Sequence, residues 1–290
     1  MNGVPEIIPP VTTRFAPSPN GSLHLGHAYS AIVAHDIAKA ANGTFLLRIE
    51  DIDGPRSRPE LADEFRRDLE WLGLEWFDVP AQSSRLAKYE AAIELLRQDG
   101  LIYPCACTRQ QFAKSQRRLG NDGQSYPGPC EGLCGAQEAS YDGASALRLD
   151  VDKAMEVVGE VVWTDEYAGN VIADPRDFGD VILVRKDLPA SYHLAVTLDD
   201  AADGVTMVTR GRDLLETTPI HRVLQELLKL PVPHWLHHPL VLDETGEKLA
   251  KRRNSPPLSA RRESGEDGRI LAEQLRNGTF GLELSEKPSI

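Results

Sequence analysis

The chain has 290 residues, 41% of them hydrophobic, enough for one large domain or two with a substantial core. Its formal net charge of −12, from 32 basic and 44 acidic side chains, argues against broad non-specific binding to nucleic acid but leaves room for a local basic surface. The start MNGVPEIIPPVTTRF has neither a basic leader nor an apolar run, and no segment approaches the ~18 apolar residues of a membrane span, so we expect a folded, soluble, cytoplasmic protein.

The first part of the chain alternates between strand and helix patterns. VTTRFAPS predicts a strand that runs into a Pro/Gly turn, and LHLGHAYSAIVAHDIAKAANG predicts a helix closed by Gly43, with Ser22 as its N-cap. TFLLRIEDID then predicts a strand that ends in acidic residues, and RPELADEFRRDLEWLGL an amphipathic helix. This alternation predicts an α/β fold with a parallel sheet.

Two histidines, His24 and His27, stand where the first predicted helix begins. A helix N-terminus offers backbone N–H groups and partial positive charge, so it suits a phosphate, and imidazoles there can add hydrogen-bond donors. Residues three apart share a helix face, and Gly26 between the histidines permits the close approach of a ring or of backbone. The alternative is a capped helix start whose histidines bind no ligand.

A cysteine cluster follows in a stretch rich in Gly, Pro and Ser that extends to about Tyr141 and looks inserted. The stretch is too poor in apolar residues to fold without a cross-link such as a bound metal ion. Four thiolates in a reducing compartment suit structural zinc, and the residues alone propose Cys105, Cys107, Cys130 and Cys134 as its ligands. The alternative is a cluster of reduced thiols without metal.

Regular patterns return after the insertion, in DFGDVILVRKD, ASYHLAVTLDDAADGVTMVTRG, TTPIHRVLQELLKL and HWLHHPLVLDETGEKLAKRR. The segment NSPPLS interrupts them, and we expect the remaining residues to form a helix or two. Within GEKLAKRR, Lys248 and Lys251 could close over a polyphosphate and neutralise charge that develops on it, although a solvated basic run is the alternative. The chain has neither a GxxxxGK[ST] nor a GxGxxG motif.

In this order, RFAPSPNGSLHLGH, RIEDID and KLAKR resemble the catalytic domain of class I aminoacyl-tRNA synthetases, in the glutamyl and glutaminyl branch. The class signatures, written HIGH and KMSKS, correspond to His24–His27 and Lys248–Arg252. The resemblance runs from about Arg14 to Arg252 and includes YHLAVTLDD and VTRGRDLLETTPIH. Ala250 and Arg252 stand where the family has serine, which puts one hydroxyl contact in question but not the lysine chemistry.

The resemblance implies a Rossmann-like parallel sheet with an inserted, acceptor-binding-like subdomain that carries a zinc site. The expected parts are 11–104 (first half of the catalytic domain), 105–190 (zinc-containing insertion), 191–253 (second half with the KMSKS-like loop) and 254–290 (short C-terminal tail). Only 38 residues follow Arg252, too few for the C-terminal anticodon-binding domain of a full-length synthetase, so we expect none. In this the chain resembles truncated paralogues of the branch that transfer glutamate to the queuosine base in the anticodon of tRNA(Asp).

The family's functional residues carry over to positions of this chain. The resemblance implies catalytic roles for His24, His27, Lys248 and Lys251, and contacts to ATP from His24, Gly26, His27 and Lys251. It implies contacts to L-glutamate from Arg14, Ser18, Glu50, Tyr192 and Arg210.

These types of residue suit glutamate, which has two carboxylates and one ammonium. Arg14 and Arg210 supply planar forks for carboxylates and Glu50 can pair with the ammonium, but which arginine reads the side chain stays open. The alternatives are an ion pair of Glu50 with Arg48 or Arg56 and a core-lining ring for Tyr192. His193 carries no functional assignment.

The zinc ligands of the branch follow the pattern C-x-C and then Y-x-x-x-C. This implies Cys105, Cys107, Tyr126 and Cys130 as ligands of one structural Zn²⁺, with Cys134 as the substitute for Tyr126. Mg²⁺ is expected with ATP.

The expected reaction activates L-glutamate with ATP to glutamyl adenylate and then transfers glutamate to queuosine-containing tRNA(Asp). The expected partners are ATP, L-glutamate and this tRNA, with no membrane and with a monomer as the default state. Arg109, Arg117 and Arg118 are candidate RNA contacts. The alternatives are the catalytic part of a glutamyl-tRNA synthetase that charges tRNA(Glu), and a catalytically silent paralogue.

Overall fold

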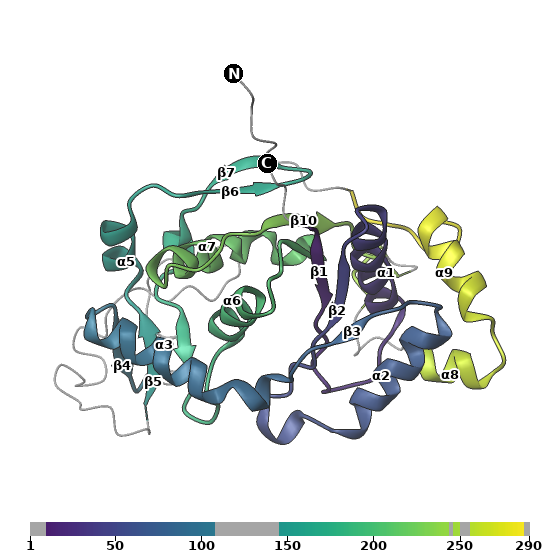
Figure 1. Cartoon of the computed structure of the whole chain (residues 1–290), viewed down its shortest axis with the longest axis horizontal. Helices are drawn as coiled ribbons and strands as arrows, with labels where there is room; N and C mark the ends of the chain where they lie inside the picture. The colour runs from purple at the N-terminus through teal and green to yellow at the C-terminus, as the bar shows by residue number, and fades with distance from the viewer. Residues whose placement is uncertain (1–9, 108–144, 244–245, 250–255, 287–290) are drawn as a thin grey trace.

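Two short sheets, joined edge to edge, form the centre of the fold (Figure 1). The structure, a computed structural model, describes residues 10–107, 145–243, 246–249 and 256–286. The first sheet has the order β1-β2-β3 and consists of the parallel strands β1 (Thr12–Phe15), β2 (Thr44–Leu47) and β3 (Phe77–Asp78). The second has the order β7-β6-β10-β9, with β6 (Val162–Asp165), β7 (Gly169–Ile172), β9 (Met207–Gly211) and β10 (His234–His238). Strands β6, β10 and β9 are parallel, and β7 is antiparallel to β6.

The two sheets meet at β1 and β9. The backbone N–H of Thr206 donates to the carbonyl of Thr12 at 3.0 Å, where both strands begin, so β1 lies between β2 and β9. The carboxyl ends of β1, β9 and β10 therefore share one edge, which is where ligands bind in open parallel sheets. The predicted parallel α/β architecture is confirmed.

The helices connect and cover these strands. They are α1 (Leu25–Ala40), α2 (Glu60–Trp71), α3 (Leu86–Gln98), α5 (Val151–Val158), α6 (Tyr192–Ala202), α7 (Thr218–Leu227), α8 (Leu258–Glu263) and α9 (Gly268–Asn277). Short 3-10 turns are η1 (Gly54–Arg56), η2 (Gln82–Arg85), η3 (Pro175–Phe178) and η4 (Arg212–Thr217). Helix α1 links β1 to β2 and α7 links β9 to β10, as parallel neighbours require. Among the described residues, no helix is both long and apolar enough to cross a membrane.

The N-cap of helix α1 lies two residues later in the sequence than expected. The N-cap is His24, whose side chain accepts a hydrogen bond from Gly26 N at 3.1 Å, so the prediction of Ser22 was wrong. An imidazole nitrogen here does what a hydroxyl usually does. At the other end Gly43 N donates to Ala38 O at 2.8 Å, and a Cβ on Gly43 would lie 1.9 Å from the carbonyl of Val11. Glycine is therefore required where the chain leaves the helix for β2.

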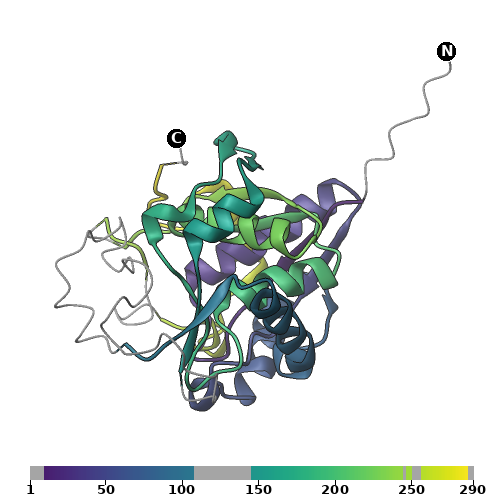
Figure 2. The same cartoon turned by 90° about the vertical axis from the view of Figure 1, so that its left-hand side faces the viewer.

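The expected insertion is closed at its base by an antiparallel sheet of order β4-β5-β8, made of β4 (Ile102–Cys105), β5 (Ala146–Leu149) and β8 (Ile182–Val184). Cys105 faces Ala146 across the first pair, so the two ends of the stretch meet. Figure 2 shows the molecule from this side. Strands β6 and β7 also fall within 105–190 in sequence, yet β6 pairs with β10. This part of the chain therefore helps to build the second sheet.

The C-terminal residues form α8 and α9, the one or two helices that the sequence predicts, and they lie beside α1 and α2 (Figure 1). Arg276 of α9 bonds Asp36 of α1 at 2.7 Å, and Arg262 of α8 bonds Asp68 of α2 at 3.1 Å. The apolar residues Leu258, Leu271 and Leu275 join the core around β2. A second core surrounds β10 and β6 and contains both Trp163 and Trp235. The tail is thus an integrated layer on the first sheet.

Candidate functional site

A cavity of about 490 Å³ opens at the shared carboxyl edge of β1, β9 and β10, beside the start of α1. The side chains and loops around it come from segments more than 200 residues apart in sequence. The predicted site residues that line it are Arg14, Ser18, His24, Gly26, His27, Glu50, Tyr192, Arg210 and Lys248. Lys251 lies outside the described residues, as do Ala250 and Arg252. The fold therefore brings the first signature and the described start of the second, Lys248, to one cavity.

The two histidines cap α1 and also face the cavity. The Nδ1 atom of His24 accepts from Gly26 N, and the Nδ1 atom of His27 accepts from His24 N at 3.1 Å. Their rings lie 3.9 Å apart, and a Cβ on Gly26 would approach the His24 ring to 3.0 Å. Gly26 thus leaves room for the neighbouring His24 ring. Because each Nδ1 accepts a hydrogen bond, each neutral imidazole carries its proton on Nε2, from which it can donate to an anion.

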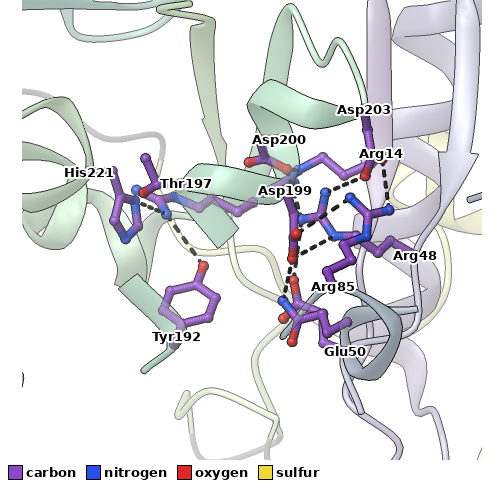
Figure 3. Close-up of polar contacts among 12 residues, drawn as sticks. Arg14, Arg48, Glu50, Arg85, Tyr192, Thr197, Asp199, Asp200, Asp203 and His221 are labelled. Carbon is purple, nitrogen blue, oxygen red and sulfur yellow. Dashed lines mark hydrogen bonds and ion pairs between the residues drawn. The ribbon is translucent and has the colours of Figure 1, made fainter. Parts of the chain in front are cut away.

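Behind the cavity, Asp200 of α6 and Asp203, the C-cap of this helix, hold the arginines of β1 and of the segment after β2 (Figure 3). Asp200 accepts from Arg14 Nε at 2.9 Å and from Arg48 at 2.8 Å. Arg48 also bonds Asp203 at 3.0 Å and Glu50 at 3.3 Å. The ion pair of Glu50 with Arg48, offered as an alternative to a binding role, is therefore present. It leaves Glu50 on the cavity wall.

This network continues away from the cavity. Arg85 bonds Asp203 at 2.8 Å and lies 3.4 Å from Asp199, which also accepts from Gln82 and Tyr89 at 2.8 and 2.9 Å. Sequence reasoning missed these residues. The signal available was the run of acids in LDDAAD, unusual on a helix whose other described positions are mostly apolar and buried.

Burial and the neighbouring arginines together set the ionisation of Glu50 and Asp200. Burial raises the pKa of Glu50 to about 7, against the attraction of Arg48 and Arg14. Burial also disfavours the charged form of Asp200, but the attraction and hydrogen bonds of Arg14 and Arg48 are stronger and hold its pKa below the ordinary value. Asp200 is thus a permanent counter-ion for Arg14. Glu50 is only part-ionised at neutral pH, and a cationic ligand group would complete its charge balance.

Arg210 of β9 lies on the other side of the cavity with a different set of partners. Its guanidinium donates to Thr218 Oγ1 at 2.7 Å, to His221 Nδ1 at 3.0 Å and to His237 Nε2 at 3.0 Å, and more weakly to Tyr192 at 3.4 Å. Among the described residues no carboxylate lies within ion-pair distance of it. Arg210 is only 5% exposed, and burial lowers its pKa. A buried cation with only neutral acceptors favours an anionic ligand group.

The partners of Arg210 are a second set that sequence reasoning missed. His193, which had no assigned role, lies 3.0 Å from His221 and so supports the ring that accepts from Arg210. His237 belongs to the HWLHH run and lies one residue before the carboxyl end of β10. Histidines at the carboxyl end of a parallel strand were the available signal, since functional groups gather there.

Tyr192 and Lys248 lie at the rim. The ring of Tyr192 is 39% exposed, so the core-lining alternative for it was wrong. Lys248 is half exposed and forms an ion pair with Asp213 of η4 beside the cavity. Ser18 lines the cavity from the loop after β1.

Only part of the expected metal site falls within the described residues. Cys105 is buried and Cys107 partly buried at the end of β4. Tyr126, Cys130 and Cys134 lie outside, as do the candidate RNA contacts Arg109, Arg117 and Arg118. Within the described part of the chain, no group of three or more His, Cys, Asp or Glu side chains could hold a metal ion. The zinc assignment stays a prediction.

Comparisons with known proteins agree with this geometry. The family model described as tRNA synthetases class I (E and Q), catalytic domain, matches residues 10–279. The chain is 48% identical to the glutamyl-Q tRNA(Asp) synthetase of Rhodobacter capsulatus, over 87% of this chain and 95% of that protein. It is 42% identical to the protein of the same name from Deinococcus radiodurans, over 91% and 87% of the two chains.

A solved structure is also similar. It is a glutamate tRNA ligase from Elizabethkingia meningosepticum in complex with its amino acid, which matches with a TM-score of 0.67 and 26% identity. The match covers 84% of this chain and 52% of the ligase, so the chain spans about half the length of that enzyme.

Proposed function

Since the chain belongs to the catalytic-domain family of the class I tRNA synthetases for glutamate and glutamine, we propose that it activates L-glutamate with ATP and transfers it to the queuosine base of tRNA(Asp). The similarity to glutamyl-Q tRNA(Asp) synthetases over nearly their whole length supports this choice within the family. One structural observation carries the choice of amino acid. The same cavity contains Arg210, which has no acidic partner among the described residues and can bind a carboxylate, and Glu50, which can bind an ammonium.

The amino-acid pocket distinguishes its two arginines. Arg14 is already balanced by Asp200, so it adds a hydrogen-bond donor to the wall more than a free charge. Arg210 has neutral partners and keeps its charge for a ligand, so we assign the side-chain carboxylate of glutamate to it. Glu50 then pairs with the ammonium. A neutral amide in place of the carboxylate would leave Arg210 buried without a counter-charge, which disfavours glutamine.

In the first step the α-carboxylate of glutamate attacks the α-phosphorus of ATP, an O–P bond forms, and pyrophosphate leaves. The start of α1 and the Nε2–H groups of His24 and His27 would donate to the phosphate oxygens as their charge changes. Lys248 and Lys251 would neutralise the leaving pyrophosphate. Bound Mg²⁺ would share the phosphate charge. Catalysis then rests on positioning and electrostatics.

In the second step a hydroxyl of the queuosine cyclopentenediol attacks the activated carbonyl carbon, a C–O ester bond forms, and AMP leaves with the electron pair of the broken acyl–phosphate bond. The proton of the hydroxyl goes to the departing phosphate or to solvent. For this the base must leave the anticodon stack, as single-stranded bases commonly do when proteins recognise them. No covalent bond to a side chain of this protein is required.

We further propose one structural zinc ion, held by Cys105, Cys107, Tyr126 and Cys130. The two cysteines at the end of β4 have the soft donors that zinc prefers, and they lie where the inserted stretch leaves the sheet. Zinc there would tie the stretch to β4 and take no part in the chemistry.

Transfer of labelled glutamate tests the proposed function. Queuosine-containing tRNA(Asp), the same tRNA without queuosine, and tRNA(Glu) are incubated with enzyme and ATP. We expect label only on the first, released with the anticodon fragment after nuclease digestion. Label on the 3′-terminal adenosine of tRNA(Glu) would instead favour a glutamyl-tRNA synthetase activity, and the absence of glutamate-dependent pyrophosphate exchange would indicate a silent paralogue.

A further inference from the structure

A buried pair, Asp165 of β6 and His237 of β10, stands directly behind Arg210. Both side chains are fully buried, and neither lines the cavity. His237 faces Arg210 in the register of β10 and β9, so the two side chains project from neighbouring strands on the same side of the sheet. The imidazole therefore lies between the carboxylate of Asp165 and the guanidinium of Arg210, bonding one at 2.7 Å and the other at 3.0 Å.

The hydrogen bonds allow a single arrangement of protons on His237. Its Nε2 atom faces the N–H of Arg210 at 3.0 Å and the hydroxyl of Thr218 at 3.3 Å, so it accepts. Its Nδ1 must then carry the proton, which it donates to Asp165 Oδ2 at 2.7 Å. Burial lowers the pKa of His237 to about 4, which agrees with a neutral ring.

Asp165 is itself held rigidly. Its Oδ1 atom accepts from the backbone N–H groups of Tyr167 and Ala168 at 2.9 and 3.0 Å, and its Oδ2 atom accepts from the backbone N–H of His237 at 3.1 Å. The edge of the Trp163 ring packs against the imidazole with ring centres 5.8 Å apart. These contacts fix the orientation of both the carboxylate and the imidazole.

We propose that Asp165 and His237 are positioning residues that orient Arg210 for the side-chain carboxylate of the substrate without neutralising it. The proposal rests on the proposed function, because it concerns the group that Arg210 binds. Arg14 shows the contrast within the same cavity, since Asp200 bonds it directly and balances its charge. A carboxylate in direct contact with Arg210 would compete with the ligand, whereas a neutral imidazole fixes the guanidinium plane and keeps the acid one ring away.

A matched pair of variants separates the roles of the two imidazole nitrogens of His237. In His237→Gln the amide oxygen can reach the position of Nε2 and accept from Arg210, while in His237→Asn the amide N–H can reach Asp165 but nothing accepts from Arg210. We expect His237→Asn to raise the KM for glutamate in pyrophosphate exchange by about 10- to 100-fold, the range for a lost hydrogen bond to a charged group. His237→Gln should raise it by less than about threefold, and neither should change the KM for ATP by more than about twofold.

Asp165→Asn tests the other end of the pair. The Asn side chain has one NH₂ group in place of a carboxylate oxygen. In one orientation this group faces the backbone N–H groups of Tyr167 and Ala168, and in the other it faces His237. The second orientation favours the tautomer of His237 that carries its proton on Nε2, where it faces Arg210. We expect a rise in the glutamate KM of about tenfold and a fall in the preference for glutamate over glutamine. His234→Gln, an exposed position on the same strand, is the control and should match the wild type.

The outcomes are distinguishable. If the wild-type protein shows no glutamate-dependent exchange, the proposed function fails. If the wild type is active but His237→Asn and His237→Gln have the same glutamate KM, the positioning role is overturned while the proposed function stands. A histidine with only a structural role would give the same KM in both variants. Should either histidine variant fail to fold, as judged by its thermal transition, Asp165→Asn decides, and a glutamate KM within about twofold of wild type overturns the proposal.

Discussion

Asp200 of α6 holds Arg14 of β1 at 2.9 Å, although 186 residues separate them in sequence. The same carboxylate holds Arg48 at 2.8 Å, so one acid is shared by two buried arginines and connects α6 to β1 and to the end of β2. Arg210, across the cavity, has no such acid among the described residues. The cavity thus contains one arginine that an acid pairs directly and one that forms no ion pair with any described residue.

Removing the shared acid should destabilise the protein strongly. Asp200→Asn leaves Arg14 and Arg48 buried without their main counter-ion, and breaking such a buried pair costs about 3–5 kcal/mol. Urea unfolding measures the free energy. Asp78→Asn, which breaks an exposed pair with Arg66, is the control and should cost less than about 1 kcal/mol. Equal losses in the two variants would contradict this account of the network.

Replacing Arg210 should impair glutamate binding more than it lowers stability. Arg210→Met removes a buried charge that forms no ion pair with a described acid, so we expect a loss of stability limited to the buried acceptors left without a donor, chiefly His221 and His237, and smaller than that of Asp200→Asn. The KM for glutamate should rise by about 100-fold, with a smaller effect on kcat, because the contact forms with substrate and transition state alike. Steady-state pyrophosphate exchange checks both constants. A large stability loss with unchanged KM would mean that Arg210 is structural.

Glutamate binding should strengthen as the pH rises through neutrality. The pKa of Glu50 is raised to about 7, so below that value the residue is mostly protonated and cannot pair with the substrate ammonium. The KM for glutamate should fall roughly tenfold per pH unit up to about pH 7 and then level off. His237 and His193, whose pKa values burial lowers to about 4, stay neutral throughout this window. Glu50→Gln should have a high, pH-independent KM, and a retained slope in that variant would assign the titration elsewhere.

Purified protein should contain one zinc ion per chain. Metal analysis after dialysis is expected to find it, and chelation should lower the thermal transition, because the metal ties the inserted stretch to the sheet. Cys107→Ser should lose the metal. Tyr126→Phe and Cys134→Ser then identify the fourth ligand by which of them loses zinc. Less than about half an equivalent in the wild type, with unchanged stability on chelation, would refute the site.

The loop lysine outside the described residues should act on the chemical step. We expect Lys251→Ala to slow pyrophosphate exchange by about 100-fold or more, the scale for losing one preorganised donor to developing charge. Lys88→Ala, at an exposed position of α3, is the matched control. A rate for Lys251→Ala within about threefold of wild type would make that lysine a solvated charge only.

The sequence by itself determined the local features of this site. The order of strand, loop and helix at the N-terminal end of the chain follows from apolar periodicity and from the Pro/Gly turn. The three-residue spacing of His24 and His27 already places both rings together at the start of α1. The family motifs then identified Arg14, Glu50 and Arg210 as cavity residues, and all three line it. Such features depend on neighbours a few residues away, which a sequence displays directly.

Only the tertiary structure decided which charges are balanced. Asp200 could not be assigned to Arg14, nor Asp165 to His237, because pairs so distant in sequence are set by strand register and by how α6 and β6 pack. The N-cap of α1 is His24 and not the predicted Ser22, because the imidazole of His24 accepts the hydrogen bond from a backbone N–H group that a serine hydroxyl was expected to accept. Composition shows how many acids and bases a chain has. Their energies depend on which of them burial brings together, since a buried charge must be matched by partners within a few ångströms.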